Sequence, residues 1–537
     1  MKQFRIAITA VLILCMLAGN AFALAEDGSD ALNQDFSLQA KVYEAAILPI
    51  VNVAKDAYAQ VQYLAGTCYF NGYGTYANME EAFNWFLVSA AQGNAKAQNN
   101  VGFCYQAGVG VKQNYAEAFK WNTLSAKQGN AYAQYALGYY YKFGWGVQAD
   151  AAQAFKWYMQ AAEQNHMDAQ YCVGNCYQAG KGVAQDYSEA FRWYTLSSEQ
   201  GSAHAQNSLG DCYQYGWGVE PDDTQAFKWY MLSAEQGYLY AQDNVGYCYY
   251  VGKGVAQNYS DAFKWYTLSA EQGSAFAQYY LGLLYQYGLG VQANDAQAFK
   301  WYMLSAEQGY MYAQESAGYC YHNGIGVAKN DQVAVKWFTA SAEQGSAYAQ
   351  CYLGYCYANG DGVAVDDEEA FKWYMLAAEQ GDMRGQEDVS KCYYSGKGVA
   401  QNYEEAIKWL TLSAAQGSAT AQNNLGYCYA QGVGVEIDYE EAFKWYMLAA
   451  EQGYSDAQAN VASCFQHGYG VEKSYEEAFQ WFSLAAEQGQ ADAQYELGLC
   501  YYSGEGVEKN LDTARDWFEK AAAQGNSDAM DMLRQMR

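Results

Sequence analysis

Proline is almost absent from this chain, which has two prolines, Pro49 and Pro221, in 537 residues. Proline interrupts helices because it lacks an N–H donor and its ring clashes with the preceding turn. With so few interruptions, and with alanine, leucine, tyrosine and tryptophan supplying apolar surface, the sequence predicts an all-α protein. Beyond the N-terminus, no stretch approaches the ~20 apolar residues that a membrane helix needs. We therefore expect no stable membrane insertion.

Basic residues are also scarce. The 30 lysines and arginines are outnumbered by 58 aspartates and glutamates, and the formal net charge is −28. Because affinity for nucleic acid depends on cationic side chains, this balance excludes a general nucleic-acid binder. Solubility is the favoured explanation for the surplus of acid, and attraction of a cationic partner is the alternative.

Histidine is the third scarce residue. The four histidines, His166, His204, His322 and His467, occupy different units of the repeat described below. A catalytic or metal site needs such side chains to converge, and no Ser-x-x-Lys nucleophile motif occurs in the chain. The sequence therefore predicts no catalytic residue, no metal site and no cofactor, in a protein that is not an enzyme.

The N-terminus has the pattern of a secretory leader. Residues 1–23 combine a basic start, an apolar run over 6–18 and the small-residue pattern Ala21-Phe22-Ala23. This predicts a signal peptide cleaved near Ala23 and an exported protein, periplasmic or secreted. The polar, acidic residues 24–40 are predicted to form a flexible segment.

Tryptophan marks an internal repeat of 36 residues. The recurring residues are Trp85, Trp121, Trp157, Trp193, Trp229, Trp265, Trp301, Trp337, Trp373, Trp409, Trp445, Trp481 and Trp517. So regular a period indicates a stack of units that contact only their neighbours. We expect thirteen units over 57–524, a degenerate N-terminal capping helix at 41–56 and a C-terminal capping helix at 525–537.

Each unit predicts an antiparallel pair of helices. The first helix, over 95–106 in one unit, contains Gly102, which costs ~1 kcal/mol in a helix and therefore indicates close approach of a neighbour. The second helix opens with a capping-box pattern, Asn114 with Glu117, and ends at a Gln-Gly pair. Asn165, which tolerates the left-handed conformation, replaces that glycine once.

Cysteine recurs at one position of the first helix, in Cys68, Cys104, Cys176, Cys212, Cys248, Cys320, Cys356, Cys392, Cys428, Cys464 and Cys500. Tyr140 and Leu284 fill that position in the other two units, so it requires packing volume rather than a thiol. Equivalent helices of neighbouring units pack ~8–10 Å apart, too far for a disulfide. Cys172 and Cys351 are poorly placed for one, and we expect no disulfide.

The first helices carry the candidate binding surface. Their residues are smaller than those of the second helices, which predicts a curved stack with the first helices on its concave side. The outward stripe comprises the residues three before, one after and four after the internal glycine. Tyrosines there have the rigid, amphipathic character of binding hot spots. The candidates are Tyr135, Tyr139, Tyr171, Asn207, Asp211, Tyr247, Tyr279, Tyr319, Tyr355 and Tyr427.

Two further patterns have a structural and a functional interpretation. Gly-x-Gly loops such as 180–182 follow helices and lack a nucleotide-binding fingerprint, which favours turns over phosphate sites. Carboxylates gather over 361–369 and 382–388. Their spacing does not match an EF-hand, which favours a solvated acidic face over a calcium site.

The second helices show a longer period. The second residue after tryptophan alternates between methionine and threonine, as Met231, Met303, Met375 and Met447 and as Thr195, Thr267, Thr339 and Thr411. This indicates duplication of a 72-residue pair. We expect the position to face outward, so one hypothesis is self-association through convex methionines. Surface variation after duplication is the favoured alternative.

The unit resembles a known repeat. The patterns AxAQxxLGxxYxxGxGV at 419–435 and xxAxxWYxxAAEQG at 440–453 resemble the Sel1-like repeat, a relative of the tetratricopeptide repeat. The resemblance implies an αα-hairpin solenoid, a right-handed superhelix of antiparallel helix pairs that serves as a scaffold or adaptor for proteins. Exported bacterial members include factors that meet host cells and cysteine-rich forms with disulfides inside each repeat. This chain lacks the second cysteine of those forms.

Together these patterns predict an exported, non-enzymatic scaffold in the bacterial envelope or in host interaction, which binds a protein or peptide through its concave face. A binder of glycans or cell wall is the alternative, because aromatic and carboxylate groups also suit sugars. A hydrolase of the β-lactamase type attributed to cysteine-rich relatives is the third reading, and the sequence offers it no nucleophile.

Overall fold

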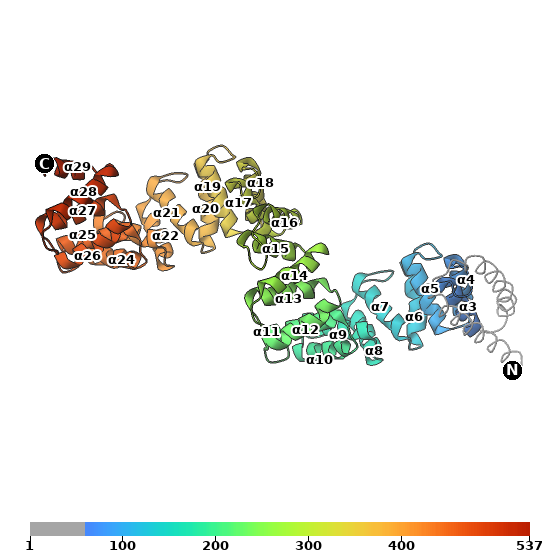
Figure 1. Ribbon diagram of the computed structural model, residues 1–537. Coiled ribbons are helices and arrows are strands. Elements are labelled where there is room, and N and C mark those ends of the chain that lie inside the picture. The colour runs from blue at the N-terminus through green and yellow to red at the C-terminus, as the bar shows by residue number, and fades with distance from the viewer. Residues whose placement is uncertain (1–58, 537) are drawn as a thin grey trace, which may run out of the picture. The chain divides into compact units, whose positions relative to one another are not determined.

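The computed structural model describes residues 59–536, which form 27 α-helices and no strand (Figure 1). The helices make thirteen antiparallel pairs and one last helix, which confirms the predicted all-α solenoid of 36-residue units. The predicted signal peptide (1–23), acidic segment (24–40) and degenerate capping helix (41–56) lie outside the described residues. The hand and curvature of the stack stay predictions, and we call the predicted binding surface the first-helix face.

The first helices of the pairs are α3 (Ala59–Asn71), α5 (Ala95–Ala107), α7 (Ala131–Phe143), α9 (Met167–Ala179), α11 (Ala203–Tyr215), α13 (Leu239–Val251), α15 (Ala275–Tyr287), α17 (Met311–Asn323), α19 (Ala347–Asn359), α21 (Met383–Ser395), α23 (Ala419–Gln431), α25 (Ser455–His467) and α27 (Ala491–Ser503).

The second helices are α4 (Met79–Ala91), α6 (Tyr115–Lys127), α8 (Ala151–Glu163), α10 (Tyr187–Glu199), α12 (Asp223–Glu235), α14 (Tyr259–Glu271), α16 (Asp295–Glu307), α18 (Asp331–Glu343), α20 (Asp367–Glu379), α22 (Tyr403–Ala415), α24 (Tyr439–Glu451), α26 (Tyr475–Glu487) and α28 (Leu511–Ala523). The last helix is α29 (Ser527–Gln535).

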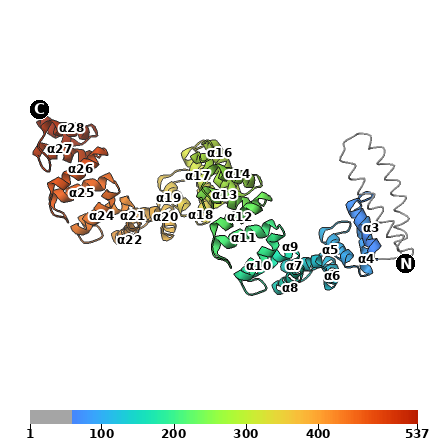
Figure 2. The ribbon, with the colours of Figure 1, turned by 60° about the horizontal axis from the view of Figure 1, so that its bottom comes forward.

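The 36-residue units are grouped into two larger compact units, and the boundary between these two lies between residues 272 and 273 of the sequence. The described part of the first contains α3–α14, and that of the second contains α15–α29. Within each unit, consecutive helices pack against one another in chain order, as both views show (Figure 2).

The helix ends follow the sequence signals with one difference. The Asn114 side chain accepts hydrogen bonds from the backbone N–H groups of Ala116 and Glu117, at 3.1 and 3.2 Å, which confirms the N-cap. The capping box is wrong, because the Asn114 N–H donates to the carbonyl of Tyr105 and the Glu117 carboxylate pairs with Lys120. The cap residue thus also ties the second helix to the first.

The backbone confirms the two turn predictions. Asn165 (φ 66°) is the one residue other than glycine with positive φ among residues 59–536, and it stands where the other units have glycine. In the 180–182 loop, a Cβ on Gly182 would lie 2.1 Å from the carbonyl oxygen of Ala151. This glycine therefore permits close packing of the loop on the preceding second helix, which confirms a turn.

In ten of the thirteen first helices the internal glycine accommodates an aromatic ring. A Cβ on Gly138 would lie 2.2 Å from the ring of Tyr158, and Gly174 and Tyr194 are related in the same way at 2.5 Å. The predicted close approach is confirmed, and the approaching group is the side chain that follows the repeat tryptophan. These rings are fully buried, so the glycine exchanges helix propensity for aromatic burial.

In two units the glycine or the ring changes and its neighbour changes as well, whereas in α25 Ala462 replaces the glycine and the aromatic Phe482 is kept. Ser390 replaces the glycine in α21, its facing residue is the smaller Leu410, and its hydroxyl donates to the carbonyl of Ala406. In α6 the ring is replaced by Asn122, which donates to the hydroxyl of the fully buried Tyr140 at 3.1 Å. Tyr140 stands where other units have cysteine, so the smaller residue in one unit is matched by a larger one in the next.

Aromatic contacts join neighbouring units. Phe119 of α6 meets Tyr141 of α7 edge-on, with ring centroids 5.5 Å apart, and Phe227 of α12 meets Tyr249 of α13 in the same way at 5.2 Å. Trp265 packs against the core that α12 and α13 form. The tryptophan that marks the period is therefore a contact between units.

A glutamine ladder runs through all thirteen units, and the sequence reasoning missed it. The glutamine that follows each second helix donates to the glutamine in the first turn of the paired first helix, as Gln380 does to Gln350 at 2.8 Å. Gln350 in turn donates to the carbonyl of Ala342 on the preceding second helix. The acceptor glutamines are buried, so a ladder step such as this one satisfies polar groups from three helices.

The methionine position is not on the surface as predicted. Met231 is half-buried and packs against the core that α12 and α13 form, and the threonines at this position donate to the carbonyl one turn earlier, as Thr267 does to Phe263. The exposed residue is the following leucine, such as Leu232. The predicted outward methionine ridge is therefore wrong, and self-association through it loses its basis.

We predict that Gln350→Ala lowers the free energy of unfolding by about 2 kcal/mol, because Gln380 and the carbonyl of Ala342 lose a buried hydrogen-bond partner. Urea denaturation followed by circular dichroism measures the change. Gln332→Ala, on the exposed surface of the neighbouring helix α18, is the control and should have little effect. Equal effects of the two substitutions would contradict the ladder's contribution.

We predict that Gly138→Ser destabilises the chain by about 1–3 kcal/mol through overpacking against Tyr158. Adding Tyr158→Leu should recover most of the loss, since Ser390 and Leu410 coexist at the equivalent positions. The Tyr158 hydroxyl has no hydrogen-bond partner among the described residues, so its removal breaks none. Additive losses in a double-mutant cycle would refute the coupling.

Candidate functional site

The candidate tyrosines lie at the border of the surface rather than fully on it. Tyr355 and Tyr427 are 46% and 48% exposed, and Asn207 is buried. The half-buried candidates are Tyr135, Tyr139, Tyr171, Asp211, Tyr247, Tyr279 and Tyr319. The structure brings Tyr135 and Tyr139 into ring contact at 5.1 Å and Asn207 and Asp211 into a 3.4 Å hydrogen bond.

Polar residues of the outward stripe also accept hydrogen bonds from buried tyrosines of the second helices. The buried ring of Tyr230 passes beneath Gly210, and its hydroxyl donates to Asp211 at 2.8 Å and to Gln214 at 3.1 Å. Tyr194 reaches Asn175 and Gln178 in the same manner. The stripe therefore satisfies the buried hydroxyls of the second helices, so its polar composition is partly structural.

Three exposed tyrosines of the first-helix face lie at a position that the sequence reasoning missed. The second residue of the first helix is tyrosine in α7, α13, α17 and α19; Tyr348 of α19 is half-buried, and Tyr132, Tyr240 and Tyr312 are 69%, 61% and 46% exposed. The signal was present in the x of the AxAQ pattern, which varies widely between units while its neighbours are fixed.

These tyrosines belong to aromatic clusters that cross from one unit to the next. In the α7 cluster, the ring of His166 lies 4.8 Å from Tyr132 and 4.7 Å from Tyr135. Lys142 lies over the ring of Tyr139. His166 also caps the next first helix, so the cluster forms across a junction between units.

A second cluster lies two units further along. In the α11 cluster, His204 stands 5.5 Å from Tyr171 and 4.6 Å from Tyr238, and Tyr238 stands 5.6 Å from Tyr240. Asp211 is close enough to raise the pKa of Tyr238, although burial of the phenol contributes most. Three consecutive first helices, α9, α11 and α13, and the loop before α13 thus supply one group of side chains.

The second of the two larger units, which begins at residue 273, has aromatic groups of the same kind. Tyr279 and Tyr310 lie 5.4 Å apart, and Tyr310 lies 5.6 Å from Tyr312. Tyr348 and Tyr352 are in contact at 4.7 Å, and the guanidinium of Arg384 lies 5.6 Å from the centre of the Tyr348 ring. Aromatic side chains therefore cover first helices from α7 to α19.

Carboxylates are interspersed with these rings. The first helices from α9 to α19 contain Asp168, Asp211, Asp243 and Glu315 and no lysine or arginine. Burial raises the pKa of Asp211 to about 6, against a smaller opposing effect of the Tyr230 hydrogen bond. Burial likewise raises the pKa of Glu315. The first-helix face here is aromatic and acidic.

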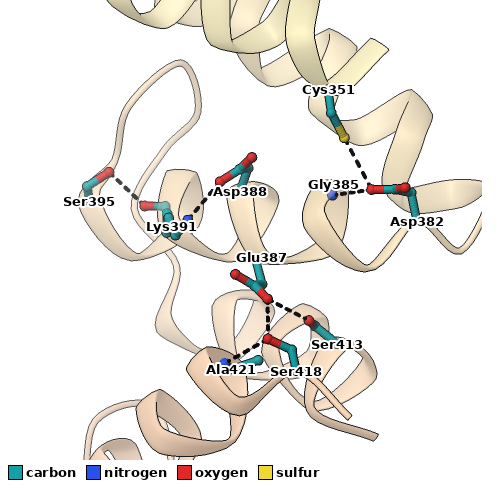
Figure 3. Close-up of polar contacts among 10 residues, drawn as sticks. All are labelled: Cys351, Asp382, Gly385, Glu387, Asp388, Lys391, Ser395, Ser413, Ser418 and Ala421. Carbon is teal, nitrogen blue, oxygen red and sulfur yellow. Dashed lines mark hydrogen bonds and ion pairs between the residues drawn. The ribbon is translucent and has the colours of Figure 1, made fainter. Parts of the chain in front are cut away.

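The acidic residues of α21 do not converge on a cation site (Figure 3). Asp382 accepts hydrogen bonds from the Cys351 thiol and the N–H of Gly385. Glu387 accepts from Ser413 and Ser418, and Asp388 pairs with Lys391 at 2.8 Å. Residues 59–536 contain no group of three or more His, Cys, Asp or Glu side chains placed to hold a metal ion.

The thirteen cysteines of the described region are free thiols, and all but Cys68 and Cys176 are buried. Burial raises the pKa of Cys172 to about 12 and that of Cys176 to about 11. Because the thiolate is the reactive form, these thiols are held in their unreactive state. Tyr140 and Leu284 are fully buried at the same position, which confirms that it requires packing volume.

A serine and a histidine side chain lie near each other in α25. The Ser463 hydroxyl lies 3.5 Å from Nδ1 of His467, but that nitrogen is 3.0 Å from the carbonyl oxygen of Ser463. A nitrogen that donates to a carbonyl cannot also accept a proton from the hydroxyl. This pair therefore lacks the geometry of a hydrolase.

The family model of the Sel1 repeat matches thirteen consecutive segments, at 59–94, 95–130, 131–166, 168–202, 203–238, 239–274, 275–310, 312–346, 347–382, 384–418, 419–454, 455–490 and 491–526. The chain is a Sel1-repeat protein. No curated protein matches it. In the described region, no helix is long and apolar enough to cross a membrane.

Solved Sel1-repeat structures are similar. One is c5321, described as a protective antigen present in uropathogenic Escherichia coli strains, with 39% identity, coverage of 78% of this chain and 90% of that chain, and a TM-score of 0.69. Another is a Sel1 repeat protein of Oxalobacter formigenes, with 33% identity, coverage of 45% and 96%, and a TM-score of 0.42.

We predict that Asp211→Asn raises the free energy of unfolding by about 2 kcal/mol at pH 7.5. A carboxyl group whose pKa is higher in the folded than in the unfolded chain loses stability as pH rises between the two values. The gain should therefore fall by about half at pH 5. Denaturation at both pH values measures it, with the exposed Glu235→Gln as control; a gain independent of pH would contradict this origin.

Proposed function

We propose that the chain is an exported, non-enzymatic scaffold that binds a segment of another protein through its first-helix face. The observation that carries this proposal is the series of aromatic clusters at consecutive unit junctions, with exposed rings in Tyr132, Tyr240 and Tyr312. Rigid amphipathic rings supply much contact area at low entropic cost, which is why they dominate binding hot spots.

The repeat architecture suits an extended ligand. Each unit adds one first helix to the face, and its fixed positions hold the stack together while the free positions differ between units. A segment that crosses several first helices would meet a different side chain at each. Affinity would then come from many moderate contacts, and specificity from their order.

Two observations support export. Residues 1–23 have the pattern of a signal peptide. The similar c5321 is described as a protective antigen of a bacterial pathogen, and an exported chain in the envelope, in contact with a host, is in keeping with that description. Excess acid on the chain would favour solubility in that setting.

Capture of partners from periplasmic and host extracts tests the proposal. We predict that replacing Tyr132, Tyr240 and Tyr312 together by serine weakens binding of the captured protein about tenfold or more. The matched control replaces Tyr187, Tyr403 and Tyr439, which are exposed on second helices, and should leave binding unchanged.

The unaltered chain and the two tyrosine variants are also tested on a glycan array. This experiment distinguishes protein binding from glycan binding, which is the alternative function. Aromatic rings beside carboxylates also suit sugars, so glycan ligands lost in the first variant, without a protein ligand, would overturn the proposal. Equal binding by the two tyrosine variants would place the binding surface elsewhere.

A further inference from the structure

The α11 cluster combines an aromatic wall with a carboxylate. Tyr171, His204, Tyr238 and Tyr240 form a continuous series of ring contacts of 4.6–5.6 Å. Asp211 lies on the same helix as His204, held by hydrogen bonds from Tyr230 and Asn207. All these residues belong to the first of the two units of the chain.

Asp211 carries its charge without a cation. None of the lysines or arginines in the described chain forms an ion pair with it, whereas Glu189 of the preceding second helix is paired with Arg192 and Asp223 of the following one with Lys253. A half-buried carboxylate without a cation costs stability. Burial raises its pKa, which is the expected response of such a group.

Tyr238 adds a second cost at the same junction. It occupies the N-cap of α13 and makes no capping hydrogen bond, whereas Ser202 and Ser274 cap the neighbouring first helices with their hydroxyls. A lost cap costs ~1 kcal/mol. The chain thus gives up a cap and leaves a carboxylate unneutralised at one junction. Asp211 lies seven residues after His204 on α11, and a spacing of two turns places the two side chains on the same side of the helix.

Other aromatic clusters of this face already contain a cation. Arg384 lies over Tyr348, and these two are the second residues of α21 and α19. Their equivalents at the α11 cluster are Tyr240 and His204, and no lysine or arginine of residues 59–536 lies over the rings of that cluster. Lys142 lies over Tyr139 and Phe143 in the α7 cluster. The chain therefore shows, in its own contacts, which group such rings bind.

We propose that the α11 cluster binds a lysine or arginine side chain of the protein partner, with its stem against Tyr171, His204 and Tyr238 and its charge at Asp211. This inference rests on the proposed function and adds the chemistry of the ligand. A cation over an aromatic face and beside a carboxylate gains from both contacts. The net charge of −28 attracts such a segment over longer distance.

The test uses the full chain and a fluorescein-labelled peptide in which arginine alternates with glycine and serine. A second peptide has citrulline, which is uncharged and of similar shape, in place of each arginine. Fluorescence anisotropy is measured at physiological ionic strength, where long-range attraction is screened. The variants are Asp211→Asn, Tyr238→Ser, which can restore the cap, and Glu235→Gln, which removes one charge from exposed surface of the same unit.

We predict that the arginine peptide binds, and that Asp211→Asn and Tyr238→Ser each weaken binding about tenfold while Glu235→Gln changes it by less than about twofold. The citrulline peptide should bind the unaltered chain about tenfold more weakly. Thermal denaturation verifies that each variant is folded. Absence of saturable binding, equal binding of the two peptides, or equal effects of Asp211→Asn and Glu235→Gln would each overturn the inference.

The two proposals fail in different ways. A captured protein partner that is lost in the Tyr132, Tyr240 and Tyr312 variant but bound unchanged by Asp211→Asn would refute the cation site and leave the scaffold function. Binding of the arginine peptide that depends on Asp211, without any protein partner that depends on the tyrosines, would support the cation site and refute the function.

Discussion

The ring that lies on the internal glycine of most first helices is the contact on which the rest of those units depends. It sets how closely the two helices of a pair approach, since any Cβ at Gly138 would overlap the ring of Tyr158. It also connects the core to the surface. The ring of Tyr230 packs against Gly210, and its hydroxyl donates to Asp211 and Gln214. The packing of the core therefore orients side chains of the candidate site.

This arrangement explains how a repeat can be rigid and variable at once. The glutamine ladder recurs in all thirteen units, and the glycine with its buried aromatic ring recurs in most of them. The second residue of the first helix takes no part in that network, and it is the one that ranges from Tyr132 to Asp168 and His204. Function can therefore be changed at this position at little cost to the fold, whereas the proposed cation site at Tyr238 and Asp211 lies where the fold gives up stability.

Much of the fold could be predicted from the sequence, because period, helix caps and left-handed residues are local signals. The Asn114 cap, Asn165 and the approach at Gly102 needed only neighbouring residues and known propensities. The ladder could not be found in this way, because Gln350 and Gln380 are polar residues that periodicity assigns to the surface, and only the meeting of three helices buries them. Met231 was wrongly predicted to be exposed for a related reason. Which residue of a helix faces outward depends on the neighbours that cover it, and for Met231 these include residues of the next unit.

The candidate site was predicted less well for a reason that also bears on the 72-residue period. The face is built at junctions, where a first-helix residue meets the cap of the next first helix 31 residues on. Glu315 accepts from Ser346, and Glu387, which is 72 residues later, accepts from Ser418. Between them Cys351 donates to Asp382, with donor and acceptor exchanged. Such a hydrogen bond forms only if the first-helix residue and the capping residue of the next first helix change together as donor and acceptor. Alternate units can therefore keep different pairs only when two consecutive units are duplicated together. The period inferred from methionine and threonine is thus present in the polar contacts between units, where it has a physical reason to persist.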